Sequence, residues 1–253
     1  MTTSAPPSLD STCFAALDVE SRTLLTQRSS RLAFRSDRPV LRTGEPVSHV
    51  LCLLKGTVRV SLRLNEGTGP LLGLLAPPSL VGLGEVLTLE KLHFNIYTIE
   101  PSDLLAVPAD LFRGWAQRQP RFAFALNLEL AGRIDTQKSQ LGRLAYGNIA
   151  ERLGRLLLDY AELCGTSTPD GIRIRARLSQ QSLAEDLGVD RKSILRSMER
   201  FRELGLLNKT QGRYVLRSED ALREFANVPR PGLELPGAEV TPLTVSAPRL
   251  IPS

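Results

Sequence analysis

The stretch from Leu178 to Leu207, LSQQSLAEDLGVDRKSILRSMERFRELGLL, constrains the fold more than any other part of the chain. Its apolar residues recur at helical spacing in two segments that are separated by a short turn. Ser179 is suited to cap the first segment, Gly188 to end it in the left-handed conformation, and Asp190 to cap the second. Two helices joined by a turn that contains glycine are typical of a helix-turn-helix.

Basic residues are concentrated in the first turns of the second predicted helix, residues 190–204. In a helix-turn-helix these turns enter the major groove of DNA, so the side chains that read bases must lie there. The candidates for base contacts are Arg191, Lys192 and Arg196. The alternative is a helical hairpin with a solvated basic face, because basic faces are common. The agreement of spacing, caps and charge favours DNA binding.

The composition agrees with a DNA-binding protein of two domains. The 253 residues are comfortable for two domains, 42% hydrophobic residues suffice for their cores, and a net charge of +5 suits a polyanionic partner. No apolar run approaches the roughly 20 residues of a membrane span. The first residues lack the pattern of a secretory signal, so we expect a cytoplasmic protein without a membrane partner. Cys13, Cys52 and Cys164 have no CxxC spacing, which predicts reduced structural thiols and no metal site.

The chain is expected to have an α+β fold whose first domain comprises residues 18–120. After a short helix, these residues form short β-like runs separated by turn residues. That pattern predicts a β-roll, a double-stranded jelly roll that can enclose a ligand. Residues 57–64 alternate between apolar and polar side chains, with Arg59 and Ser61 on the polar face of the predicted strand.

Residues 121–145 predict a long amphipathic helix that mediates dimerisation. Its heptad seam contains, at positions a and d, the residues Asn127, Leu130, Ile134, Gln137, Leu141 and Leu144. The alternative is that this stripe packs against the β-domain of its own chain. A homodimer is favoured, because a helix-turn-helix dimer reads the two half-sites of an inverted repeat in double-stranded DNA.

Residues 146–227 are expected to form a winged helix-turn-helix domain. The segment LLNKTQGRYVLR, residues 206–217, predicts a hairpin with Gln211 and Gly212 at its turn. Such a hairpin is a wing, and its cations would contact phosphates. Residues 1–17, which are rich in Ser, Thr and Pro, and the proline-rich residues 228–253 are predicted to be disordered.

The order of β-roll, long helix and winged helix resembles the Crp/Fnr family of bacterial transcription regulators. The resemblance covers roughly residues 30–217 and is strongest in AERLGRLLLDYAEL, residues 150–163, and in PDGIRIRARLSQQSLAEDLGVDRKSILRSMERFRELGLL, residues 169–207. The segment GEPVSHVLCLLKGTVRV, residues 44–60, resembles the first β-roll signature of the family. The resemblance implies a dimeric, sequence-specific DNA-binding protein that activates or represses transcription, usually with RNA polymerase as a second partner.

Residue by residue, the resemblance assigns base reading to Arg191, Lys192 and Arg196. Arg196 is suited to guanine, because a bidentate arginine on guanine is the commonest specific contact. Lys192 is a departure, since the best-known members carry Glu there, an acceptor suited to cytosine. A lysine donates and should prefer guanine or a phosphate, so the operator is expected to deviate from the family consensus. Phosphate contacts are assigned to Ser179, Gln181, Ser193 and Arg213.

The effector region departs further from the family. Members that bind cyclic AMP carry a Gly-Glu start, followed several residues on by an Arg that neutralises the cyclic phosphate. Here Gly84 and Glu85 resemble the start, but His93 and its two neighbours stand where the Arg pair belongs, and Lys91 is the only nearby cation in the sequence. An uncompensated buried phosphate is unfavourable. We therefore predict a regulator that does not depend on cyclic AMP, with an unidentified effector or none.

Cofactors and catalysis are not expected. An iron–sulfur sensor needs a cluster of N-terminal cysteines, and a haem sensor would have to use a lone histidine such as His49 or His93. An enzyme lacks support, because there is no phosphate-cradling glycine loop after a strand and no nucleophile elbow. The second hypothesis is a ligand-binding dimer whose winged helix serves protein contacts, in which case the basic start of the second helix would be unexplained.

Overall fold

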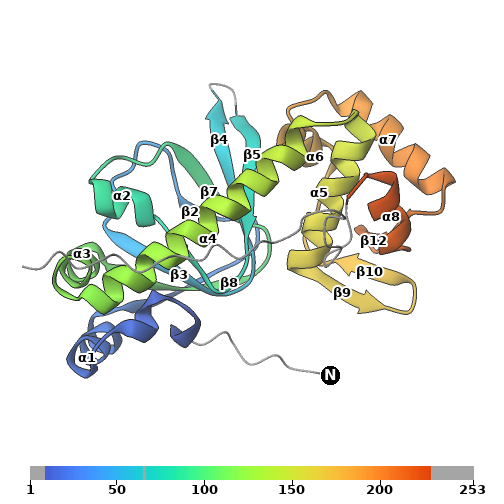
Figure 1. Ribbon diagram of the computed structural model, residues 1–253. Helices are drawn as coiled ribbons and strands as arrows, with labels where there is room; N and C mark the ends of the chain where they lie inside the picture. Colours follow the sequence, from blue (N-terminus) through green and yellow to red (C-terminus); the bar gives the residue numbers. More distant parts are fainter. Residues whose placement is uncertain (1–8, 65–66, 229–253) are drawn as a thin grey trace, which may run out of the picture.

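The computed structural model describes residues 9–64 and 67–228, and their side chains except those of 63–68 and 135–145. The prediction of disorder for residues 1–8 and 229–253 concerns residues outside this part of the chain. The described residues form an N-terminal β-roll, a long helix and a C-terminal winged helix-turn-helix (Figure 1). The predicted α+β architecture is confirmed.

Two antiparallel four-stranded sheets form the β-roll. The first sheet has, in spatial order, β1 (Ser30–Phe34), β8 (Ser102–Pro108), β3 (His49–Lys55) and β6 (Ser79–Val81). The second has β2 (Pro39–Leu41), β7 (Phe94–Thr98), β4 (Val58–Leu64) and β5 (Gly67–Leu75). Their inner faces enclose an apolar core that includes Leu53, Val58, Ile96 and Leu104.

Helices close the roll on one side. They are α1 (Val19–Arg28), α2 (Leu83–Thr88), α3 (Ala109–Arg118) and α4 (Pro120–Ala145). The helix α4 crosses the roll diagonally and leads to the C-terminal domain (Figure 1). Its first turns are anchored by aromatic packing, because the ring of Phe122 lies 5.3 Å from that of Phe112 and 6.1 Å from that of Trp115.

The N-terminal segment requires a correction to the prediction of disorder for residues 1–17. Residues 9–17 contain two short 3-10 helices, η1 (Leu9–Ser11) and η2 (Cys13–Ala16). Phe14 is buried against the same aromatic cluster, with its ring 5.9 Å from that of Phe112. Burial of a whole aromatic side chain repays the ordering of this segment, an effect that its polar composition does not reveal.

The C-terminal domain is built from four helices and a small sheet in the described residues. The helices are α5 (Ile149–Cys164), α6 (Gln180–Leu187), α7 (Arg191–Glu203) and α8 (Glu219–Phe225). The strands are, in spatial order, β11 (Leu207–Thr210), β12 (Arg213–Leu216), β10 (Gly171–Ile174) and β9 (Gly165–Thr168). The helix α5 begins with a capping box between Asn148 and Glu151, which satisfies its first amides.

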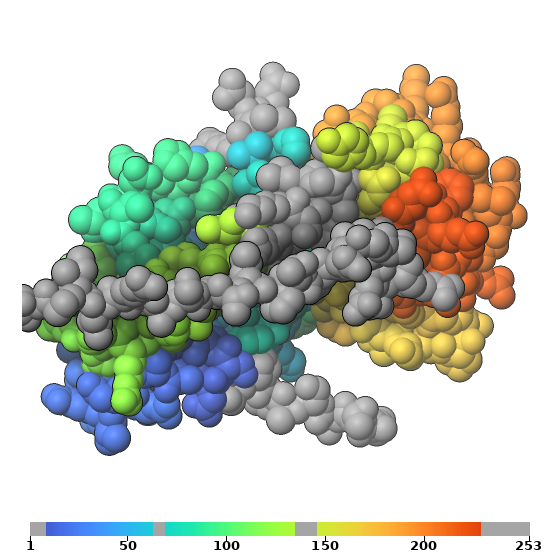
Figure 2. Space-filling model, in the orientation of Figure 1, coloured from blue at the N-terminus to red at the C-terminus, as the bar shows by residue number. Residues whose placement is uncertain are grey.

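Apolar contact is continuous between the two domains. Leu71 and Leu74 of β5 and Ile99 belong to the same buried cluster as the core of the C-terminal domain. Because α6 packs against β5, α7 is left at the edge of the molecule that is remote from the roll (Figures 1 and 2). This arrangement positions the predicted recognition helix with one face free.

Candidate nucleic-acid interface

The turn between α6 and α7 has the caps that the sequence predicts. The Ser179 hydroxyl accepts a hydrogen bond from the backbone N–H of Ser182 at 2.9 Å. Gly188 ends α6 with φ +62°, a conformation that favours glycine. Asp190 caps α7 by accepting from the backbone N–H of Ser193 at 2.9 Å, and hydrogen bonds from Ser193 lower the pKa of Asp190. These caps fix the angle at which α7 leaves the turn.

One face of α7 is buried and the opposite face is exposed. Ile194, Met198 and Phe201 are buried in the core of the domain. Lys192 and Arg196 are exposed, and neither side chain has a hydrogen bond or an ion pair with any described residue. The anchored face holds the helix, and the free cations are available to a ligand.

Arg191 is exposed and partly oriented. Its Nε and Nη2 atoms donate to Oε1 of Gln180 at 3.4 and 3.3 Å. The three predicted base-contact residues therefore lie together at the exposed start of α7. Their contacts with bases remain a prediction.

The residues predicted to contact phosphate surround this surface. Gln181 is exposed, and its amide donates to Glu185 at 3.1 Å. Ser193 uses its hydroxyl to donate to Asp190 at 2.6 Å, and Ser179 uses its hydroxyl in the cap of α6. Arg213 is half-buried at the start of β12. The serine hydroxyls thus serve the fold first, and their phosphate contacts remain predictions.

The wing is the β11–β12 hairpin. Gln211 and Gly212 form its turn with φ of +52° and +76°, as a two-residue hairpin turn requires. The Nζ atom of Lys209 lies 5.2 Å from the centre of the Tyr214 ring, within cation–π range. The predicted hairpin is therefore present beside α7.

The predicted effector residues lie around α2. Gly84 is exposed and Glu85 is half-buried within this helix, and His93 is exposed just before β7. Two residues on, Asn95 is buried and accepts a hydrogen bond from the backbone N–H of Thr43 at 3.0 Å. This segment fills its polar positions with contacts inside the roll.

Arg133 of α4 enters the same region and was missed from the sequence. Its Nη1 atom donates to the carbonyl oxygen of Leu80 at 2.7 Å. Burial lowers the pKa of Arg133, and the charges of Glu129 and Glu85 act in the opposite direction. Lys91 is the only nearby cation in the sequence, and Arg133 adds a second cation in space. A long helix distant in sequence supplies this second cation, and no local motif marks it.

Comparison with known proteins identifies both domains. Residues 31–119 match the cyclic nucleotide-binding domain family, and residues 151–225 match the Crp-like helix-turn-helix domain family. These two matches cover the roll and the winged helix in the order seen in the structure. The chain belongs to the Crp/Fnr family of transcription regulators. This is a family of regulators and not of enzymes.

Crp/Fnr relatives match over most of their length. The global nitrogen regulator of Synechocystis is 26% identical over 193 residues, which are 76% of this chain and 86% of the relative. The CRP-like cAMP-activated global transcriptional regulator of Mycobacterium tuberculosis is 22% identical over 81% of this chain and 92% of the relative. A crystal structure of a putative Crp/Fnr regulator from Eubacterium rectale superposes with a TM-score of 0.70 at 15% identity, covering 85% of this chain and 97% of that one. The last comparison supports the fold.

The heptad seam of α4, which the sequence predicts to mediate dimerisation, is only partly exposed. Asn127 is exposed and the side chain of Ile134 is 52% exposed, whereas Leu130 is half-buried against the roll of its own chain. The side chains of Gln137, Leu141 and Leu144 lie outside the described ones. Phe124 and Leu128, which the heptad omits, are 66% and 59% exposed. The exposed apolar side chains of α4 thus include Ile134 of the predicted seam together with Phe124 and Leu128, and the seam itself remains a prediction.

Two ion pairs join the roll to the helix-turn-helix domain. Arg59 of β4 lies 2.7 Å from Asp186 of α6, as an ion pair without hydrogen-bond alignment, and the Tyr160 hydroxyl donates to Asp186 at 2.8 Å. Burial raises the pKa of Asp186 to about 6, although the charge of Arg59 lowers it. At the second pair, Nε of Arg175 lies 2.7 Å from Oε2 of Glu100. The DNA-binding domain is thus held through charged contacts beneath the helix-turn-helix.

Other features of the described residues do not suggest a site. The three cysteines are free and buried, and burial raises the pKa of each thiol, which makes them unreactive. No group of three or more His, Cys, Asp or Glu among the described residues is placed to hold a metal ion. None of the described helices is both long and apolar enough to span a membrane.

Proposed function

We propose that this Crp/Fnr regulator binds an inverted-repeat operator as a homodimer, with residues 190–204 in the major groove, and that it does so without cyclic AMP. The observation that carries DNA binding is the set of exposed cations in the first half of α7. Arg191, Lys192 and Arg196 are exposed on a helix whose other face is anchored in the core. Cations at this position meet base edges when the first turns enter the major groove.

Each cation has a distinct role in the proposal. Arg196 reads guanine through its bidentate fork, and Lys192 donates to guanine or to a phosphate. Arg191 is held near the duplex by Gln180, so less side-chain entropy is lost on binding. Ser179, Gln181, Ser193 and Arg213 position the domain through phosphates.

The proposed dimer forms through α4. Phe124, Leu128 and Ile134 are exposed apolar residues within an arc of about 120° of the helix, and Asn127 lies within the same arc. A second copy of α4 would cover this face and give the two-fold axis that an inverted repeat requires. The dimer is proposed to meet RNA polymerase as a further partner and to act in the cytoplasm.

Independence from cyclic AMP rests on the charges around α2. Arg133 could neutralise a cyclic phosphate, but it donates to the Leu80 carbonyl and faces the carboxylates of Glu129 and Glu85. Its charge is therefore already balanced within the fold. His93 is exposed, and it stands at the place where family members that bind cyclic AMP carry an Arg pair. We therefore do not expect cyclic AMP to activate this protein, although it activates a relative.

Selection of bound sequences from a random duplex library, with purified protein at near-physiological salt and no added ligand, tests the proposal. We expect an inverted repeat whose half-sites are about one helical turn, or about 34–36 Å, apart. Recovery only after addition of cyclic AMP would contradict the independence. Recovery of no sequence under either condition would favour the second hypothesis, in which the winged helix binds proteins.

A further inference from the structure

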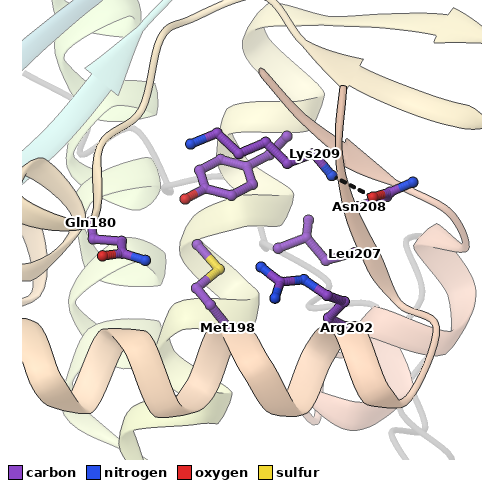
Figure 3. A pocket seen from close by; sticks show the side chains of 7 residues that line it. Gln180, Met198, Arg202, Leu207, Asn208 and Lys209 are labelled. Atoms are coloured by element: carbon purple, nitrogen blue, oxygen red, sulfur yellow. Dashed lines mark hydrogen bonds between the residues drawn. The ribbon is translucent and has the colours of Figure 1, made fainter. Parts of the chain in front are cut away.

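A small pocket of about 100 Å³ lies between α7 and the wing (Figure 3). Met198 and Leu207 form its apolar floor, and Arg202 and Lys209 enter it from the helix and the wing. Gln180, at the start of α6, forms the third side, and Asn208 and Tyr214 complete the lining. The pocket therefore joins the first helix, the recognition helix and the wing.

Hydrogen-bond donors predominate among the polar groups of this pocket, because the side-chain oxygen of Asn208 already accepts from the backbone N–H of Lys209 at 2.7 Å. Arg202 and Lys209 form no ion pair with any described residue, and no carboxylate lines the pocket. Gln180 uses its carbonyl oxygen to accept from Arg191, which turns its amide nitrogen toward the pocket (Figure 3). Burial raises the pKa of Tyr214, so its hydroxyl keeps its proton at neutral pH and can donate. An arrangement of donors with two cations selects an anion.

The pocket lies beside the proposed DNA-reading residues. Arg202 follows Arg191 by eleven residues, about three turns of an α-helix, so the two side chains leave α7 on the same side. Gln180 contacts Arg191 and also lines the pocket. A backbone phosphate at the edge of the groove is the anion that this side of α7 would meet while its first turns occupy the major groove.

We propose that this pocket binds one backbone phosphate of the operator, held by Arg202 of α7 and Lys209 of the wing. The inference rests on the proposed function and adds a contact that ties the wing and the recognition helix to a single phosphate. Because phosphates carry no sequence information, the contact sets the depth and angle of α7 rather than base preference.

Salt titrations of DNA affinity test the pocket. Arg202→Gln and Lys209→Gln are compared with Arg200→Gln, which removes the same charge from the other side of α7, where Arg200 lies 5.1 Å from the Phe225 ring. Binding is measured by fluorescence anisotropy with the selected operator and with an unrelated duplex over a range of KCl concentrations. Each single variant is expected to weaken both duplexes by the same factor and to reduce the slope of log affinity against log salt by less than about 0.9, because the remaining cation still neutralises the phosphate.

The double variant gives the decisive comparison. If Arg202 and Lys209 share one phosphate, the variant lacking both loses about 0.9 from the slope in total, because only this variant leaves the phosphate without a cation. A loss of about 1.8 would assign them to two phosphates and overturn the shared pocket. If every pocket variant has the same salt slope as Arg200→Gln, the phosphate contact itself is overturned.

Controls separate this inference from the proposed function. Thermal melting of each variant shows whether the domain is folded. If a Gln variant melts below the assay temperature, Arg202→Met or Lys209→Met removes the charge at the same position and keeps the apolar stem, whereas Arg202→Lys keeps the charge and should keep the slope. If the wild-type protein binds DNA with a steep salt dependence and the pocket variants have the same slope as wild type, the phosphate contact of the pocket is refuted and the proposed function is not. Wild-type protein that binds no DNA refutes the proposed function.

Discussion

At the start of α7, the side chains that build the helix and those that remain free are different residues. Asp190 and Ser193 bond to each other in the cap, and Ile194 lies in the core. Arg196 is exposed and has no hydrogen bond or ion pair with the described residues, so its substitution should leave the fold intact. We expect Arg196→Ala to cost about 1–3 kcal/mol of binding at one base position and to relax preference there. Affinity for operators altered at single positions measures this, and equal weakening on every sequence would make Arg196 a phosphate contact.

Lys192 gives a second prediction at the scale of one residue. The side chain is exposed and unpaired among the described residues, so Lys192→Glu changes a donor into an acceptor without disturbing the core. We expect the selected operator to change at one position of each half-site toward cytosine, whose amino group donates to a carboxylate. An unchanged operator with a uniform loss of affinity would show that Lys192 contacts a phosphate instead.

Of the described elements, α4 leaves the most large apolar side chains exposed. We expect Leu128→Glu to place a charge at the centre of the proposed dimer face and to yield monomers, because a buried unpaired carboxylate costs several kcal/mol. Sedimentation equilibrium measures the assembly, and the variant should lose the full operator while keeping weak half-site binding. Leu89→Glu, the same change at an exposed leucine beyond α2, is the control and should remain dimeric. A dimeric Leu128→Glu protein would place the interface elsewhere.

The elements that the sequence predicts are those with local signals. The caps at Ser179 and Asp190, the turn at Gly188 and the hairpin turn at Gly212 each depend on a few neighbouring residues, and all of them are present. The heptad pattern on α4 predicts less, because the periodicity of a long helix does not tell which of its apolar residues pack against the β-roll of the same chain and which remain exposed. Leu130 lies against the roll, and this depends on the aromatic anchoring that orients the whole helix.

At the scale of the molecule, the features that the sequence does not reveal come from contacts between distant segments. The alternation of residues 57–64 predicts a strand with a polar face, and β4 confirms the strand. That polar face is covered by the C-terminal domain, so Ser61 is buried and Arg59 pairs with Asp186. Arg133 reaches the effector region in the same way. The sequence does not indicate which residue a charged side chain will contact, because that contact depends on how the domains pack.

The contact between the domains makes stability depend on pH through Asp186. Arg59 of β4, Tyr160 of α5 and the neighbouring Glu185 face its carboxyl group, and burial, the largest effect, raises the pKa from 3.8 to about 6. A raised pKa means that the folded protein binds more protons than the unfolded chain between these two values. The free energy of unfolding is therefore expected to fall as pH rises from about 4 to above 6, by on the order of 3 kcal/mol.

Denaturant unfolding at a series of pH values measures this dependence. Asp186→Asn replaces the titrating group with a neutral amide, so its free energy of unfolding should lack this decrease and should lie close to that of wild type near pH 4, where the Asp186 carboxyl is protonated. Asp103→Asn, at an exposed aspartate of β8, should keep the wild-type profile. Parallel profiles for wild type and Asp186→Asn would mean that Asp186 titrates alike in the folded and unfolded chains. A difference confined to this pH range would identify the buried pair beneath the helix-turn-helix as the point where protonation and domain contact are linked.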